Sequence, residues 1–227
     1  MDRGRLEAFS DGVFAVAITL LVLNLAVAGP GTLHHRNPPL LQQLGHLWPA
    51  FAAYVLSFFM IGIIWVNHHA LIRSLKTVDR TLLFLNVVLL LFVVLIPFTT
   101  GLVAEYLSAY LHRTPGGGDA GVAMALYGAV FFGMSVGFGA IFEWTLHGDR
   151  VFQPVPRELH WPARIRFVGG GGVYLVAIAV APVGPIASFV IMGLLAVYYI
   201  FERTPTMSQT PGDPGAADSP GDDSPLI

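Results

Sequence analysis

The chain has 227 residues, of which 55% are hydrophobic and only 11% are charged, whereas a soluble globular domain carries about 25% charged residues. It has no cysteine, which excludes a disulfide framework and a thiolate metal site, and its net charge of -2 gives no electrostatic basis for nucleic-acid binding. Because only a bilayer solvates so much apolar surface on so short a chain, we expect an all-α polytopic membrane protein rather than a soluble enzyme.

Six segments come close to the length of about 20 mainly apolar residues that a transmembrane helix needs. In chain order they are 7–28, 47–71, 81–103, 121–142, 167–181 and 185–201. The Pro and Gly residues between the last two segments predict a tight turn. The alternative is one kinked segment over 167–201, which at about 1.5 Å per residue would overshoot a ~30 Å hydrocarbon core. We therefore expect six transmembrane helices in a domain of residues 1–203. The stretch 204–227, rich in Pro, Gly, Ser and Asp, is predicted to be a disordered tail.

The Lys and Arg residues predict the orientation. If the N-terminus is cytoplasmic, ten of the twelve fall on the cytoplasmic side, and only Arg36 and Arg113 fall outside. This bias favours two cytoplasmic termini and an even number of spans, as in a multi-pass protein of the cell membrane. The first span is not expected to be a cleaved signal peptide, because Asp11 follows the charged start and the apolar run is long.

Polar residues inside a membrane are costly, so each one suggests a function. The first span holds Ser10, Asp11 and Thr19. Asp11 could be reached by Arg5 from the interface or from a neighbouring subunit. Alternatively, Asp11 simply complements the dipole at the helix N-terminus.

One face of the first span combines Val16, Leu20 and Leu23, and Thr19 borders it. Such a leucine face is typical of lipid contact or helix packing. Small residues beside it, among them Gly12, favour close packing with other helices over free contact with lipid.

The second span ends in Trp65, Asn67, His68 and His69. These residues could form an interfacial aromatic belt and a polar cap, or they could hydrogen-bond to the region of Asp11 on the same side of the membrane. A membrane di-iron site fits poorly, because the other histidines are scattered along the chain, and we expect no resident metal and no cofactor.

The third span contains Asn86, for which His68 and Ser10 are candidate partners, and Pro97, which is predicted to kink or end the helix. The sequence has no GxSxG, HExxH, phosphate-loop or dinucleotide motif and no TVGYG-like filter. An enzyme is therefore not expected.

The first three spans resemble the transmembrane protein 175 family of potassium channels, in its prokaryotic branch. The resemblance rests on Arg5, on Phe9-Ser10-Asp11, and on the run Thr19-Leu20-Leu21-Val22-Leu23. It continues with the Trp65, Asn67 and His68 cluster, with Asp79 and Asn86, and with Leu95-Ile96-Pro97-Phe98. It covers roughly residues 3–104, and the later spans agree only in hydropathy.

The resemblance implies a potassium-permeable channel that assembles as a homotetramer, with the first helix of each subunit lining a central pore. Val16, Leu20 and Leu23 would form an apolar constriction, and Thr19 would contribute to selectivity. The pore helix would be braced by a network listed in order as Arg5, Phe9, Ser10, Asp11, Trp65, Asn67, His68 and Asn86. Two departures are Val16, where a larger Ile is frequent, and Asn24, where an acidic residue or Pro occurs.

Two other functions remain open. A proton-coupled secondary transporter could use Asp11 and His68 as a relay, although no internal repeat of the kind that many transporters contain is evident. A membrane protein without transport could use its polar residues only for helix packing. In each case the expected partners are the bilayer and, for the channel, potassium ions, with no nucleic acid.

Overall fold

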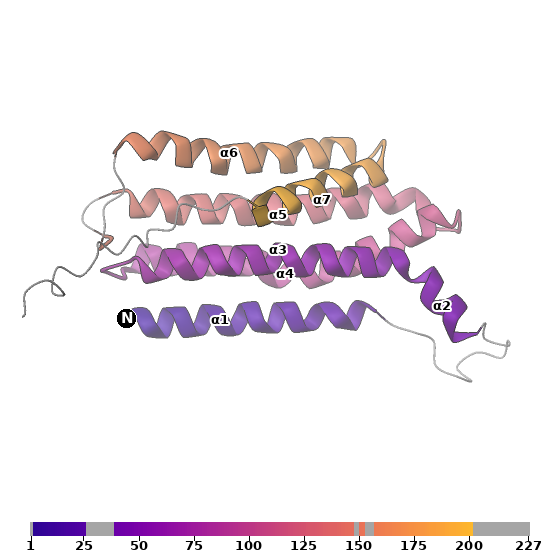
Figure 1. Cartoon of the computed structure of the whole chain (residues 1–227), viewed down its shortest axis with the longest axis horizontal. Coiled ribbons are helices and arrows are strands. Elements are labelled where there is room, and N and C mark those ends of the chain that lie inside the picture. Colours follow the sequence, from indigo (N-terminus) through magenta and orange to yellow (C-terminus); the bar gives the residue numbers. More distant parts are fainter. Residues whose placement is uncertain (1, 26–38, 148–149, 153–156, 202–227) are drawn as a thin grey trace, which may run out of the picture.

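The structure, a computed structural model, describes residues 2–25, 39–147, 150–152 and 157–201. Its described residues form a bundle of helices, in which the long helices lie side by side along the long axis of the molecule (Figure 1). They are α1 (Arg3–Leu20), the 3₁₀ turn η1 (Leu21–Asn24), α2 (Leu40–His46), α3 (Trp48–Arg73), α4 (Arg80–Leu111), η2 (Gly117–Asp119), α5 (Ala120–Thr145), α6 (Arg157–Val180) and α7 (Pro185–Phe201). The predicted tail 204–227 and the predicted end of the first span, 26–28, lie outside the described residues.

Helices α1 and α4 each begin at an aspartate that caps them. The Asp2 side chain accepts a hydrogen bond from the Gly4 N–H at the start of α1. The Asp79 side chain accepts one from the Leu82 N–H at 2.8 Å at the start of α4. Such caps satisfy backbone donors that have no partner inside the helix.

Among the residues that the structure describes, four helical segments are long and apolar enough to cross a membrane, namely Arg3–Asn24, Trp48–Arg73, Arg80–Leu111 and Gly117–Thr145. Two shorter apolar helices, Gly169–Val180 and Pro185–Phe201, correspond to the fifth and sixth predicted spans. The chain turns back between α6 and α7, where the Gly184 N–H donates to the Val180 carbonyl at 2.9 Å, so the alternative of one continuous segment is wrong.

The structure differs from the sequence prediction in the third span. Pro97 lies inside α4, and the helix continues to Leu111 instead of ending near residue 103. Proline removes one backbone hydrogen bond, and neighbouring helices compensate for such a loss within a membrane protein. The short helix α2 and the 3₁₀ turn η1 were not predicted.

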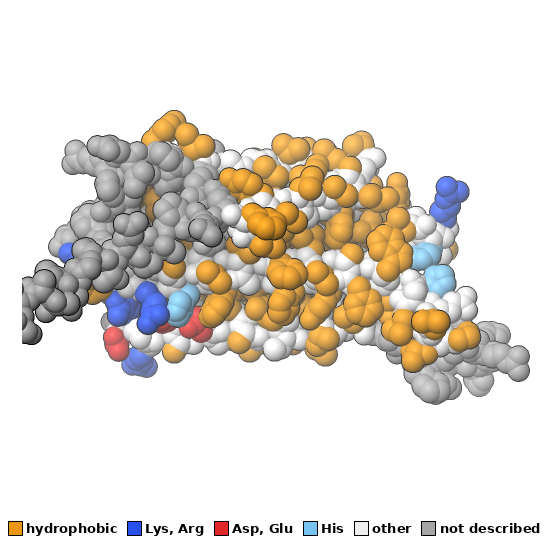
Figure 2. Space-filling view, viewed as in Figure 1, with side chains coloured by type: hydrophobic (Ala, Val, Ile, Leu, Met, Phe, Trp, Pro, Cys, Tyr) orange, Lys and Arg blue, Asp and Glu red, His pale blue; other side chains and the backbone are white. Residues whose placement is uncertain are grey.

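Helix α4 lies at the centre of the fold, because α1, α3 and α5 all pack against it. A buried polar cluster joins three of these helices: the Ser57 hydroxyl of α3 lies 2.8 Å from both the Thr100 hydroxyl of α4 and the Tyr127 hydroxyl of α5. Space-filling Figure 2 shows apolar side chains covering the middle of the molecule and charged groups gathered towards its ends, as expected for a chain that crosses a bilayer.

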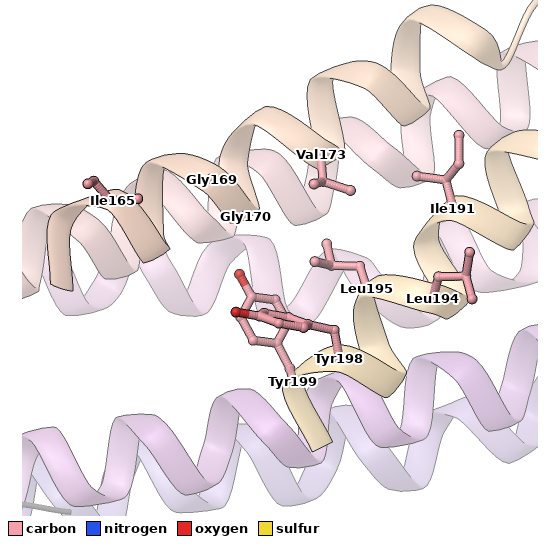
Figure 3. A pocket seen from close by; sticks show the side chains of 9 residues that line it. All are labelled: Ile165, Gly169, Gly170, Val173, Ile191, Leu194, Leu195, Tyr198 and Tyr199. Carbon is pink, nitrogen blue, oxygen red and sulfur yellow. The ribbon is translucent and has the colours of Figure 1, made fainter. Parts of the chain in front are cut away.

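At the far side of the bundle, α6 and α7 line an open apolar pocket of about 530 Å³. Figure 3 shows Tyr198 and Tyr199 of α7 on one side of it and the Gly169–Gly170 backbone of α6 on the other. A β-carbon at Gly170 would collide with the Tyr199 hydroxyl, so a larger residue there would displace the end of the Tyr199 side chain.

Candidate functional site

Helix α1 has two faces with different surroundings. Its buried face carries Leu6, Ser10, Phe14 and Ala17, spaced three or four residues apart, and it packs chiefly against α3 and α4. Its opposite face, continued by η1, is exposed in the single chain and contains the four residues predicted to line a pore, of which Leu23 lies in η1. Val16 is 56%, Leu20 40% and Leu23 71% exposed, and Thr19 is exposed beside them.

The buried face of α1 is joined to the bundle through a chain of three polar side chains. The Asn86 amide of α4 donates to the Ser10 hydroxyl at 3.0 Å, and its carbonyl oxygen accepts from the His68 Nε2 of α3 at 2.7 Å. Ser10 in turn donates to the Leu6 carbonyl at 2.9 Å. All three side chains are buried, and Asn86 contacts both of the partners that the sequence predicted for it. We call Ser10, His68 and Asn86 the buried triad.

Phe14 completes the surroundings of the buried triad, since its ring centroid lies 5.3 Å from that of His68. The sequence analysis did not single out Phe14. Its spacing of four residues from Ser10 could have placed it on the same helix face.

Asp11 belongs to a second, more exposed group. It accepts a hydrogen bond from the Trp65 Nε1 at 2.8 Å, and its other oxygen lies 3.7 Å from the Nδ1 of His69. Glu7, which the sequence analysis did not propose as a site residue, lies 3.4 Å from the same His69 nitrogen and 3.7 Å from the Nε of Arg73. Asp11 and His68 therefore lie in separate groups, and the structure places His69 rather than His68 beside the carboxylate.

The remaining predicted residues lie on α1 and α3. Arg5 and Phe9 lie on the exposed side of α1, and Asn67 is half-buried on α3.

The opposite end of α1 is fixed by a contact that the sequence analysis did not predict. The Asn24 amide of η1 donates to the Pro97 carbonyl of α4 at 2.9 Å. Gly101 makes room for it, since a β-carbon there would lie 2.8 Å from the Asn24 Oδ1. Asn24 is therefore a tether between η1 and α4.

The start of α1 also contacts the connections between α3 and α4 and between α5 and α6. The Arg3 guanidinium donates to the carbonyls of Arg73 and Leu75 at 3.2 and 3.1 Å and lies 5.6 Å from the ring of Phe152. Leu75 pairs with Val151 in an antiparallel bridge, so α1 is connected to the α3–α4 and α5–α6 connections at once.

These features lie in a chain that is 39% identical, over 94% of its length and 98% of the relative, to a potassium channel of Streptomyces collinus. The chain belongs to the TMEM175 family. The family profile described as endosomal/lysosomal potassium channel TMEM175 matches residues 5–97, which hold α1, α3 and the first half of α4.

Other TMEM175 relatives agree with this assignment. A potassium channel of Chamaesiphon minutus is 35% identical over 87% of the chain and 93% of the relative. The crystal structure of a lysosomal potassium-selective channel TMEM175 homolog from Chamaesiphon minutus aligns with a TM-score of 0.73 and 32% identity, covering 87% of this chain and 96% of that one. The fold is therefore the all-helical TMEM175 membrane fold, and the predicted family is confirmed. A family of channels also agrees with the prediction that the chain is not an enzyme.

Proposed function

We propose that this TMEM175 protein is a potassium-permeable channel of the cell membrane, a homotetramer in which four copies of α1 surround the pore. The choice of potassium as the permeant ion is supported by the relatives from Streptomyces collinus and Chamaesiphon minutus. Both are named potassium channels, and they match this chain over most of its length. We assign α6 and α7 as the fifth and sixth spans and both termini to the cytoplasm, because that orientation keeps most Lys and Arg residues inside.

The observation that carries the proposal is the exposed apolar face of α1. Val16, Leu20 and Leu23 are exposed in the described part of the single chain, while the other face of α1 is bonded to α3 and α4. One helix cannot enclose a pore, so symmetry-related copies must supply the other walls. Rings of these apolar side chains then form a neck that closes by dewetting and opens by widening.

Thr19 is the polar residue best placed to favour potassium. Its hydroxyl donates to the Val16 carbonyl at 2.9 Å in its own helix, and the side chain is exposed. A hydroxyl that donates to the backbone keeps its oxygen lone pairs for a cation. Four such oxygens around the pore would replace part of the hydration shell of a potassium ion, which supports a modest preference over sodium.

The polar contacts of α1 act, in this proposal, as braces at its two ends. The buried triad and the Trp65–Asp11 bond hold one end against α3, and the Asn24 tether holds the other against α4. Arg5 and Phe9 lie on the exposed side of α1, so we assign their bracing role to contacts with a neighbouring subunit.

The test is potassium flux into liposomes that contain the purified protein, with sodium as the ionic control. Leu23→Ala removes bulk from the proposed neck and is expected to raise potassium flux by about tenfold, since each ~1.4 kcal/mol removed from a barrier is tenfold in rate. Val94→Ala, at a residue on α4 that is 53% exposed to the surroundings, is the matched control and should leave flux unchanged.

Flux of neither ion in either protein would remove the pore assignment. The proton-coupled carrier would replace it if Leu23→Ala had no effect while Asp11→Asn abolished uptake driven by a proton gradient. A reversal potential that does not change in Thr19→Ala would remove the assigned role of that residue in selectivity.

A further inference from the structure

A cluster of metal-ligating side chains lies between α1 and α3, outside the buried triad. Glu7 and Asp11 come from successive turns of α1, and His69 comes from the end of α3 that faces them. One carboxylate oxygen of each acid and the Nδ1 of His69 all lie within 4.8 Å of one another. The Nδ1 is 3.4 Å from the Glu7 Oε1 and 3.7 Å from the Asp11 Oδ2.

The His69 nitrogen is the meeting point of the cluster. The Nδ1 atom is shielded from solvent and faces both carboxylates, although the side chain as a whole is 31% exposed. The Glu7 and Asp11 side chains are 21% and 34% exposed, which leaves a route by which a hydrated ion can reach them.

The separations fit one ion placed among the three atoms. Ligand atoms at about 2.0–2.2 Å from a tetrahedral zinc ion lie about 3.3–3.6 Å from one another. The two separations from the His69 nitrogen, 3.4 and 3.7 Å, fall at or just beyond this range, and the two carboxylate oxygens lie within 4.8 Å of each other, so side-chain rotations that bring the carboxylates closer would complete the site. A nitrogen ligand together with two carboxylates suits zinc and its neighbours among the transition metals better than magnesium or calcium, which prefer oxygen alone.

We propose that Glu7, Asp11 and His69 form a binding site for one divalent transition-metal ion of the zinc class, which links α1 to α3. Three protein ligands leave a fourth position for water. This proposal concerns binding, and it stands whether or not the chain conducts potassium.

The surroundings of the cluster orient its ligands. Trp65 donates to the Asp11 Oδ1 at 2.8 Å, which turns the Oδ2 towards His69, and the Trp65 ring lies 5.6 Å from the imidazole. Partners of this kind raise metal affinity by fixing the ligands. Arg73 opposes a cation, since its Nε lies 3.7 Å from the Glu7 Oε1, but its side chain is 67% exposed and can move into water.

The test is isothermal titration of the full-length protein, stripped of metal by a chelator and carrying no histidine tag, with zinc alone. We expect one zinc per chain. Glu7→Gln and His69→Gln should each weaken the affinity at least tenfold, and Trp65→Phe should weaken it by roughly tenfold. His147→Gln is the matched control, because His147 is exposed and its Nδ1 bonds to the Glu143 carbonyl in the last turn of α5.

Arg73→Gln is expected to change the zinc affinity in the opposite direction. Removing a positive charge beside Glu7 should tighten zinc binding a few-fold, whereas damage to the fold would weaken it. The thermal midpoint of the wild-type protein should rise with zinc concentration, and it should not rise in His69→Gln.

Zinc binding at a different place, a pair of histidines at the other end of the bundle, would overturn the proposal. The His46 Nδ1 and His112 Nε2 lie 3.2 Å apart at the other end of the bundle and could also hold a metal. If His112→Gln abolishes the binding while Glu7→Gln and His69→Gln leave it intact, the ion binds there and our assignment is wrong. Absence of zinc binding in the wild-type protein would contradict it as directly.

Discussion

Asn86 connects three helices through one buried side chain. It bonds to Ser10 of α1 and to His68 of α3 from its own position on α4. In Asn86→Ala the His68 Nε2 loses its partner in a buried setting, while Ser10 keeps its bond to Leu6. We expect a loss of about 1–2 kcal/mol in the free energy of unfolding, the scale of interhelical hydrogen bonds and of a buried unsatisfied group.

Thermal unfolding in detergent measures this loss. Val87→Ala is the control, because the neighbouring side chain on α4 is 54% exposed and its truncation should change the midpoint little. Equal effects of the two substitutions would mean that the buried triad contributes no more than ordinary side-chain packing.

At the residue scale, the sequence correctly predicted the partners of Asn86 but not the histidine that lies beside Asp11. An unpaired polar side chain inside a membrane is costly, which indicated that Asn86 needs partners. The structure shows bonds to both predicted partners, His68 and Ser10. The sequence analysis also paired His68 with Asp11, where the structure places His69, because adjacent residues differ by about 100° around a helix and only the packing of α3 fixes its rotation. For the same reason Glu7 was overlooked as a partner of His69.

At the scale of elements, the joint between η1 and α4 depends on the absence of a side chain at Gly101. Gly101→Ala would place a β-carbon 2.8 Å from the Asn24 Oδ1 and displace the amide from the Pro97 carbonyl. In the wild-type background we expect this clash to cancel or exceed the gain of up to about 1 kcal/mol that alanine brings to a helix. In an Asn24→Ala background the same substitution should stabilise the protein.

A double-mutant cycle on unfolding measures the coupling, which we expect to be about 1–2 kcal/mol for two side chains in direct contact. Gly139→Ala on α5 is the matched control, because a β-carbon there meets no atom within 4 Å. It should have the same effect in both backgrounds. Additive effects of Gly101→Ala and Asn24→Ala would show that the tether is not what requires glycine.

The elements themselves follow from hydropathy and breaker residues, and their ends follow only where a breaker residue marks them. The sixth predicted span, 185–201, has the bounds of α7, because Pro185 starts the helix and supplies no N–H where none is needed. Helix α4 runs eight residues beyond the predicted third span, since hydropathy marks the stretch suited to lipid, and a helix can continue past it into water. The turn η1 depends on the Asn24–Pro97 contact, which joins residues 73 positions apart and leaves no local signal.

At the scale of the whole molecule, the apolar face of α1 is the surface that a single chain leaves unexplained. Composition predicted a membrane protein, and lipid alone could cover Val16, Leu20 and Leu23. Four equivalent copies would cover them instead with one another and with the pore. The sequence cannot distinguish these cases, because symmetry is a property of the assembly and not of any one helix pattern.

The absence of native cysteine allows this question to be tested directly, since each introduced thiol is the only one in the chain. We expect Leu20→Cys and Leu23→Cys to form covalent dimers with a short bismaleimide, because symmetry brings each of these positions close to its copies around the pore. Val94→Cys, at an exposed position on α4, should remain uncrosslinked. Native mass spectrometry of the untreated protein should give the mass of four chains. Equal crosslinking at Val94, or the mass of a single chain, would return the apolar face of α1 to lipid contact and remove the basis for a central pore.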